Sequence, residues 1–232
     1  MRNTVKLLFF LLIVFSCGEK KLVSPKNYKN TILVDTSDTI QVKNFENQRN
    51  ALLNELPTLN RGDSYTLKIF EVSNQLEPRP SLEFEYPKKG GVPEDLGEYG
   101  LQNANDSLKG NVKKELLNFK IANKSSSDKS QIFYNVDEII KSERPDVFYL
   151  FTDLIENNRK ISFYKIDPSL KSSEILKDLY SYYKISDTVS HFSNTKIVVF
   201  SKFSDNNQDR ILQTRKFFQD YFNKLKVKYE FK

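Results

Sequence analysis

Residues 31–35 read TILVD and residues 147–153 read VFYLFTD, and these two stretches decide the fold. Each is a short, mostly apolar run that ends in an acid. A run with apolar residues on both faces is typical of a strand in a parallel sheet that helices cover on both sides. We therefore predict two central strands of one sheet, with Asp35 and Asp153 at the same edge.

Outward from these strands, β-forming stretches alternate with stretches of helical periodicity. Further strands are predicted at 64–72, at 195–200 and, as an edge strand, at 226–231; helices are predicted at 45–56, 112–121, 132–142, 172–183 and 208–225. This alternation predicts a doubly wound α/β fold with a mainly parallel central sheet and helices on both faces. Ligands of such sheets bind beyond the carboxyl ends of the strands.

Residues 77–110 are the least regular part of the chain. They hold four of the eight prolines and five of the seven glycines. Both residue types favour turns over helices and strands. We predict an irregular surface insertion here, with a short edge strand at 82–86.

The amino-terminal residues carry the pattern of an export signal. Arg2 and Lys6 precede the apolar run 7–15, which is too short to span a bilayer as a helix of about 20 residues. The only cysteine of the chain, Cys17, stands where that run ends. Residues 14–17, VFSC, resemble the lipobox of bacterial lipoproteins, and the resemblance implies cleavage before Cys17 and acylation of that residue.

The predicted organisation follows from this pattern. Residues 1–16 are a lipoprotein signal peptide, 17–29 a polar tether near the lipid, and 30–232 a single domain. We expect a lipid-anchored protein of the cell envelope, in the outer membrane and facing the periplasm or the surface. A formal charge of +6 does not indicate nucleic-acid binding, because the lysines are interspersed with acids.

Composition also excludes several classes of site. His191 is the only histidine and no cysteine follows Cys17, so neither an ordinary zinc site nor a Ser-His-Asp triad is predicted, and His191 is expected on a surface loop. No Gly-Lys-Ser/Thr follows Gly90-Gly91, which excludes a phosphate-binding P-loop.

Two motifs resemble those of von Willebrand factor A domains. Residues 32–39 read ILVDTSDT, similar to the family pattern Asp-x-Ser-x-Ser after a buried strand, and residues 147–156 read VFYLFTDLIE, similar to its fourth strand with Ser/Thr-Asp. Residues 217–222, FFQDYF, resemble the last helix of bacterial members. The resemblance covers residues 31–232 in element order and implies a Rossmann-like domain whose partner site holds a divalent cation.

That resemblance implies which residues bind Mg²⁺ or Mn²⁺. Asp35 and Asp153 would supply carboxylates from facing loops, and Ser37 and Thr39 neutral hydroxyls, which suits a hard cation with oxygen ligands. The family's threonine before a helix has no match here, so Ser130 is the candidate, with Ser126 and Ser127 as alternatives. The partner would be a protein whose own carboxylate completes the site.

Two other interpretations stay open. The strand-end acids are also typical helix or turn caps, which would leave a metal-free, structural envelope lipoprotein. Asp35 after a buried strand invites comparison with haloacid-dehalogenase-like phosphatases, although Ser37 replaces the second acid of their Asp-x-Asp motif. With no nucleophile and base pair evident, we predict a protein that is not an enzyme.

Overall fold

The computed structural model describes residues 24–37, 39–72, 78–121, 130–158, 161–165, 167, 169–186, 191–202 and 208–232. The signal peptide, Cys17 and the first part of the tether lie outside these ranges. The strands are β1 (Asn27–Val34), β2 (Ser64–Glu71), β3 (Pro80–Tyr86), β4 (Val147–Phe151), β5 (Lys196–Phe200) and β6 (Lys228–Phe231). The helices are α2 (Thr39–Leu52), the 3-10 turn η1 (Leu53–Glu55), α3 (Glu98–Asn118), α4 (Ile132–Glu143), α5 (Ser172–Tyr183) and α6 (Gln208–Leu225).

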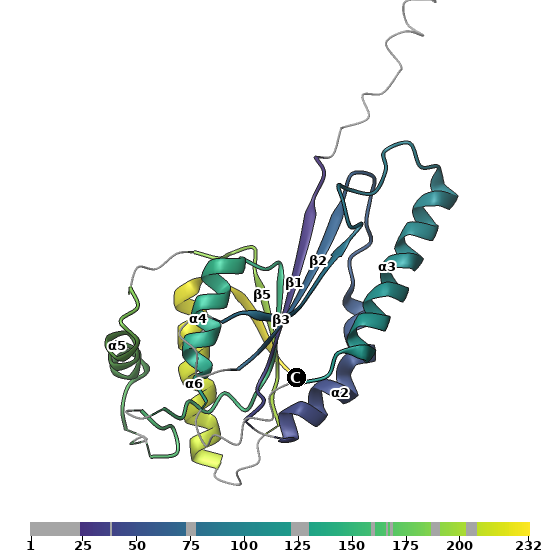
Figure 1. The fold of residues 1–232 in the computed structure, drawn as a ribbon. Coiled ribbons are helices and arrows are strands. Elements are labelled where there is room, and N and C mark those ends of the chain that lie inside the picture. The colour runs from purple at the N-terminus through teal and green to yellow at the C-terminus, as the bar shows by residue number, and fades with distance from the viewer. Residues whose placement is uncertain are drawn as a thin grey trace, which may run out of the picture.

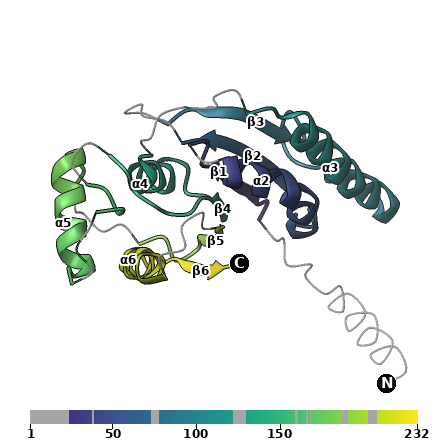
Figure 2. The same ribbon diagram turned by 90° about the horizontal axis from the view of Figure 1, so that it is seen from below.

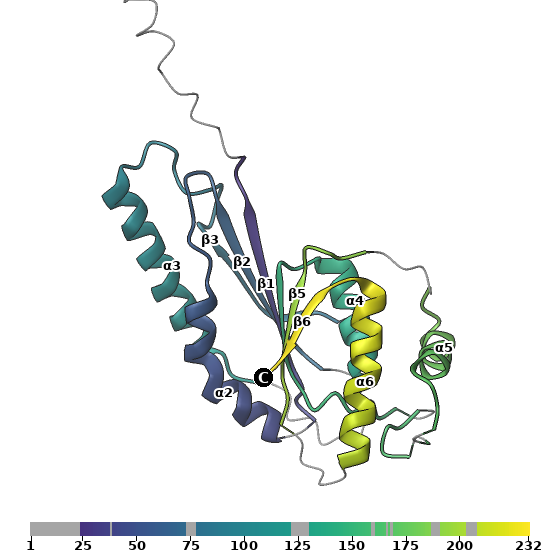
Figure 3. The ribbon, with the colours of Figure 1, turned by 180° about the vertical axis from the view of Figure 1, so that it is seen from behind.

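The six strands form one sheet in the order β3-β2-β1-β4-β5-β6 (Figure 1). Every neighbouring pair is parallel except β2 and β3, which are antiparallel. The predicted mainly parallel α/β sheet is therefore confirmed, with β1 and β4 adjacent at its centre. Figure 3 shows β6 and β3 at the two edges.

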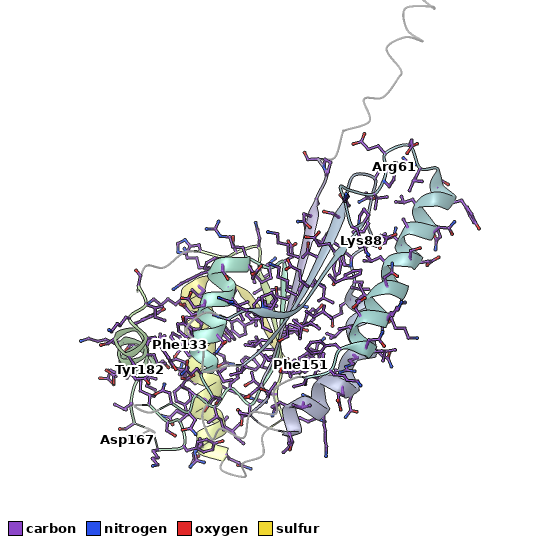
Figure 4. All side chains as sticks on the ribbon, viewed as in Figure 1. Arg61, Lys88, Phe133, Phe151, Asp167 and Tyr182 are labelled. Carbon is purple, nitrogen blue, oxygen red and sulfur yellow. The ribbon has the colours of Figure 1, made fainter. Side chains whose placement is uncertain are left out.

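Helices cover both faces of the sheet (Figure 2). On one face, Ile32 and Val34 of β1 pack with Phe45 of α2 and the buried residues of α3. On the other, Leu33 packs in a second cluster with residues of α4, α5 and α6. Alternate residues of β1 and β4 enter the two clusters, which explains why both strands read as continuous apolar runs. In Figure 4, Phe133 and Phe151 mark these two sides.

The predicted boundaries of α4, α5 and α6 agree with the structure to within one residue, and those of β4 and β5 do as well. The start of the domain was placed too late, because β1 begins at Asn27 and so takes the last three residues of the predicted tether, 17–29. Residues 27–29 pair with the first residues of β2 before β4 begins alongside at Asn30. Their polar side chains gave no strand periodicity.

Residues 77–110 are not an irregular insertion throughout. They contain β3, slightly longer than the predicted edge strand 82–86, and more than half of α3. The helix buries Leu108, Val112 and Leu116 in the core at intervals of four residues, and Leu101 and Ala104 pack against the core partly buried. Gly100 and Gly110 lie within it, and glycine disfavours helix by about 1 kcal/mol, so the sequence pattern indicated a loop.

Helix α2 begins at Thr39, six residues before the predicted start at Phe45. Its first turns bury two amides, Gln41 and Asn44, where a hydrophobic pattern would require apolar residues. The side chain of Gln41 donates to the backbone oxygen of Lys202, and that of Asn44 to the backbone oxygen of Phe200 at 3.3 Å. Hydrogen bonds to the end of β5 therefore fix this part of the helix.

Candidate functional site at the carboxyl edge of the sheet

Asp35 and Asp153 follow neighbouring strands, β1 and β4. The last residues of those strands, Val34 and Phe151, are register partners, and the N–H of Asp35 donates to the backbone oxygen of Phe151 at 2.8 Å. Both acids therefore lie at the carboxyl edge of the sheet, as the sequence predicted. Their side chains are almost wholly buried, with 1% and 4% exposure.

The carboxylate of Asp35 is held by donors from two loops. Its Oδ1 accepts from the N–H of Ser37 at 3.0 Å and from the Ser37 hydroxyl at 2.6 Å. Its Oδ2 accepts from the hydroxyl of Thr152 at 3.2 Å. These hydrogen bonds satisfy oxygens of a buried carboxylate, which would be costly to bury without them. Ser37 itself is exposed, so its hydroxyl oxygen keeps lone pairs that face solvent.

The loop after β4 folds tightly around Asp153. Oδ1 of Asp153 accepts from the N–H of Ile155 at 2.9 Å, and the Thr152 hydroxyl oxygen accepts from the N–H of Leu154 at 2.9 Å. Leu154 has φ +64, a left-handed conformation that an L-residue adopts at a cost of about 1–2 kcal/mol. Its side chain is completely buried, and this packing offsets the backbone cost.

Ser130 lies against that same loop. Its hydroxyl donates to the backbone oxygen of Ile155 at 2.8 Å, and its backbone pairs with Asn157 in both directions at 2.9 and 3.0 Å. The structure thus joins Ser130, just before α4, to the segment that carries Asp153. The alternatives Ser126 and Ser127 lie outside the described residues. Thr39 is the first residue of α2, with an exposed side chain.

Glu156 is a buried acid that the sequence analysis did not select. Its Oε2 accepts from the N–H of Phe133, in the first turn of α4, at 2.8 Å. Its Oε1 accepts from the Asn158 amide at 2.9 Å and from the Tyr183 hydroxyl of α5. Complete burial, with a smaller contribution from the Asp35 charge, raises the pKa of Glu156 to about 7 against the opposing effect of the three hydrogen bonds.

The donor set suits a hard cation. Two carboxylates, Asp35 and Asp153, end neighbouring strands, and the hydroxyls of Ser37 and Ser130 come from loops at the same edge. Oxygen donors of mixed charge, completed by water, are what Mg²⁺ and Mn²⁺ take. Within the described ranges no group of three or more His, Cys, Asp or Glu side chains forms a metal cluster, so any cation here depends on the hydroxyls.

A separate groove of about 860 Å³ runs between α5 and α6, away from the strand ends. Its apolar residues include Leu170, Ile175 and Leu212, and Leu212 is 63% exposed. The hydroxyl of Ser172 donates to Asp220 at 2.6 Å across it. The groove shares no residue with the predicted site, so its size does not bear on that site.

Comparison with known proteins gives no relative. No family model matches the chain, and no curated protein sequence matches it. In the part of the chain that the structure describes, none of the helices is both long and apolar enough to cross a membrane.

Proposed function

We propose that this chain is a lipid-anchored binding protein of the cell envelope, without catalytic activity, that captures a protein partner at the carboxyl edge of its sheet. One observation carries the proposal. Acids and hydroxyls of three loops, after β1, before α4 and after β4, lie at the carboxyl edge of the sheet, where ligands of parallel sheets bind. The anchor is Cys17, at the end of an apolar export segment, which would hold the chain at the outer membrane.

The strand order supports the resemblance to von Willebrand factor A domains. In that interpretation β1 and β4 lie at the switch point of the doubly wound sheet, and Asp35-x-Ser37 and Thr152-Asp153 stand at their ends. A divalent cation, Mg²⁺ or Mn²⁺, would be held by Asp35, Ser37, Ser130 and Asp153, with Thr39 completing the set from the start of α2. Neutral hydroxyl ligands leave a cation electrophilic, so that it attracts a carboxylate of the partner.

Thermal unfolding with and without cation tests this site. A cation that binds only the folded state stabilises it by about 2.7 kcal/mol at a hundredfold excess over Kd. The melting temperature should rise with millimolar Mg²⁺ or Mn²⁺ and fall back with chelator. Asp35→Ala should abolish the response, and Asp153→Ala should weaken it.

Asp167→Ala is the matched control, because Asp167 is exposed and lies away from the strand ends (Figure 4). It should leave the cation response intact. A wild-type melting temperature that does not change across millimolar cation would eliminate the metal part of the proposal, and the partner would then be sought by pull-down from the envelope.

A chromogenic phosphate ester separates this proposal from the phosphatase alternative. Turnover with Mg²⁺ that is lost in Asp35→Asn would make Asp35 a nucleophile and the chain an enzyme. We expect no turnover, because Ser37 occupies the place of the second acid.

A further inference from the structure

The chain enters the domain through a rigid turn at one end of the sheet. The N–H of Lys26 donates to Oδ1 of Asp63 at 2.8 Å, and the N–H of Ser64 donates to the backbone oxygen of Lys26 at 2.9 Å. A Cβ on Gly62, which has φ +81, would lie only 2.9 Å from the ring of Pro25. These contacts fix both the point and the direction in which the tether leaves.

Beside this entry lies a surface built from three chain segments. Lys26 Nζ lies 3.5 Å from a carboxylate oxygen of Asp146, and the other oxygen accepts from the N–H of Lys29 at 2.9 Å. The backbone oxygen of Asp146 accepts from Lys196, and that of Thr195 accepts from Lys228. The ends of α4 and α6 and the starts of β5 and β6 therefore lie at the same end of the sheet as the tether entry, and Asp146 contacts the entry directly.

This surface, which we call the basic shoulder, presents the cations Arg144, Lys226 and Lys228. All three are exposed, and among the described residues none is seen in an ion pair. The neighbouring acids are occupied: Glu143 pairs with Lys68 at 2.9 Å, and Glu230 pairs with Lys196 at 3.1 Å. In the part of the chain that the structure describes, no ion pair neutralises the positive charge of the basic shoulder.

Two of these cations occupy unusual backbone positions. Arg144, the C-cap of α4, has φ 48, and Lys226, just after α6, has φ 56. Glycine or asparagine ordinarily takes this left-handed position. Attraction to the negative end of the helix dipole explains part of the preference for a cation at these two positions. It does not explain Lys228, which belongs to a strand.

We infer that the basic shoulder lies against anionic phospholipid headgroups of the membrane that holds the chain. This inference rests on the proposed anchoring. Only six residues separate Cys17 from Ser24, a reach of at most about 25 Å, so the end of the domain that bears the entry stays near the bilayer. Each Lys or Arg near an anionic surface strengthens the contact about fivefold.

The test uses the full chain, extracted from its native membrane in detergent and reconstituted with vesicles of phosphatidylcholine alone or with phosphatidylglycerol. Flotation of the protein with the vesicles measures anchoring. The rate of amide hydrogen exchange measures contact between the basic shoulder and the lipid headgroups. We expect flotation with both vesicles, with slower exchange at the exposed loop residues Ser193 and Asn194 in anionic vesicles only. High salt should reverse the protection.

The variant Arg144→Gln/Lys226→Gln/Lys228→Gln removes three charges and should weaken contact on the order of a hundredfold, at about fivefold per residue. Glutamine tolerates the two left-handed positions as well as the native residues do. The control Lys43→Gln/Lys165→Gln/Lys202→Gln removes the same charge from exposed positions at the carboxyl end of the sheet and should keep the protection.

Each outcome decides between the two proposals. Flotation with both vesicles but equal exchange would overturn the membrane contact and leave the anchoring. Flotation only with anionic vesicles would support the contact and overturn the anchoring. Flotation with neither would overturn both.

Discussion

At the scale of single residues, Glu156 links three parts of the domain. Its carboxyl accepts hydrogen bonds from the first turn of α4, from Asn158 in its own loop and from Tyr183 on α5. Burial raises its pKa to about 7, so the folded state holds a proton that the unfolded chain loses near pH 4.5. The contribution of Glu156 to the unfolding free energy is therefore largest below pH 4.5. It decreases as the pH rises to about 7.

Glu156→Gln should remove this pH dependence. A neutral amide has the same shape, so wild type should lose about 2 kcal/mol of unfolding free energy relative to the variant between pH 5 and pH 8. Urea unfolding of both proteins at the two pH values measures the difference. Glu85→Gln, at an exposed position of β3, should show no such change. An equal pH dependence in wild type and Glu156→Gln would contradict the burial explanation.

Asp35 and Asp153 were predictable because each directly follows an apolar run, and the carboxyl ends of parallel strands share an edge. Ser130 could be proposed only from its place before a helix. Glu156 was not selected, since nothing in its local sequence shows that α4 and α5 would bury it. The partners that bury it, Phe133 and Tyr183, are more than twenty residues away.

At the scale of elements, α3 depends on three buried side chains in twenty-one residues. Leu116 is 1% exposed and its neighbour Leu117 is 53% exposed, so the pair forms a matched test. Leu116→Ala should lower the unfolding free energy by about 2–5 kcal/mol, through lost burial and the cavity left behind. Leu117→Ala should change it by less than about 0.5 kcal/mol. Equal losses would mean that α3 does not pack on the sheet as described.

Helices with a clear apolar side were predictable in type and extent. In α4, buried Ile132, Val136, Ile139 and Ile140 recur at helical spacing, and α6 repeats the pattern with aromatic residues. The predicted helix 112–121 covers only the last turns of α3, and residues 98–111 and the first turns of α2 were missed for the opposite reason. Apolar residues are sparse in the first part of α3, and α2 begins with buried amides, so neither stretch has a clear apolar side in the sequence.

At the scale of the whole molecule, the position of Cys17 predicts processing. Mass spectrometry of chain extracted from its membrane should find Cys17 as an acylated amino terminus, because the thiol stands at the end of the apolar segment. Cys17→Ser should abolish acylation. Cys17→Ser/Ser24→Cys should not restore it, because the sulfur then lies beyond the processing position. An intact Met1 or an unmodified Cys17 would contradict the prediction.

Strand β1 begins at Asn27, three residues after Ser24, where the tether ends. It ends at Val34, one residue before Asp35. In the proposed arrangement it joins the tether directly to the loop after β1, one of the three loops that would bind the partner. Tension between the membrane anchor and a bound partner would run lengthwise along β1. This strand has eight register partners in β2 and five in β4. Backbone hydrogen bonds loaded lengthwise must yield together, whereas a strand peeled sideways loses them one at a time. If the chain is anchored and captures a partner as proposed, this geometry would keep the domain folded when the partner pulls on the anchor.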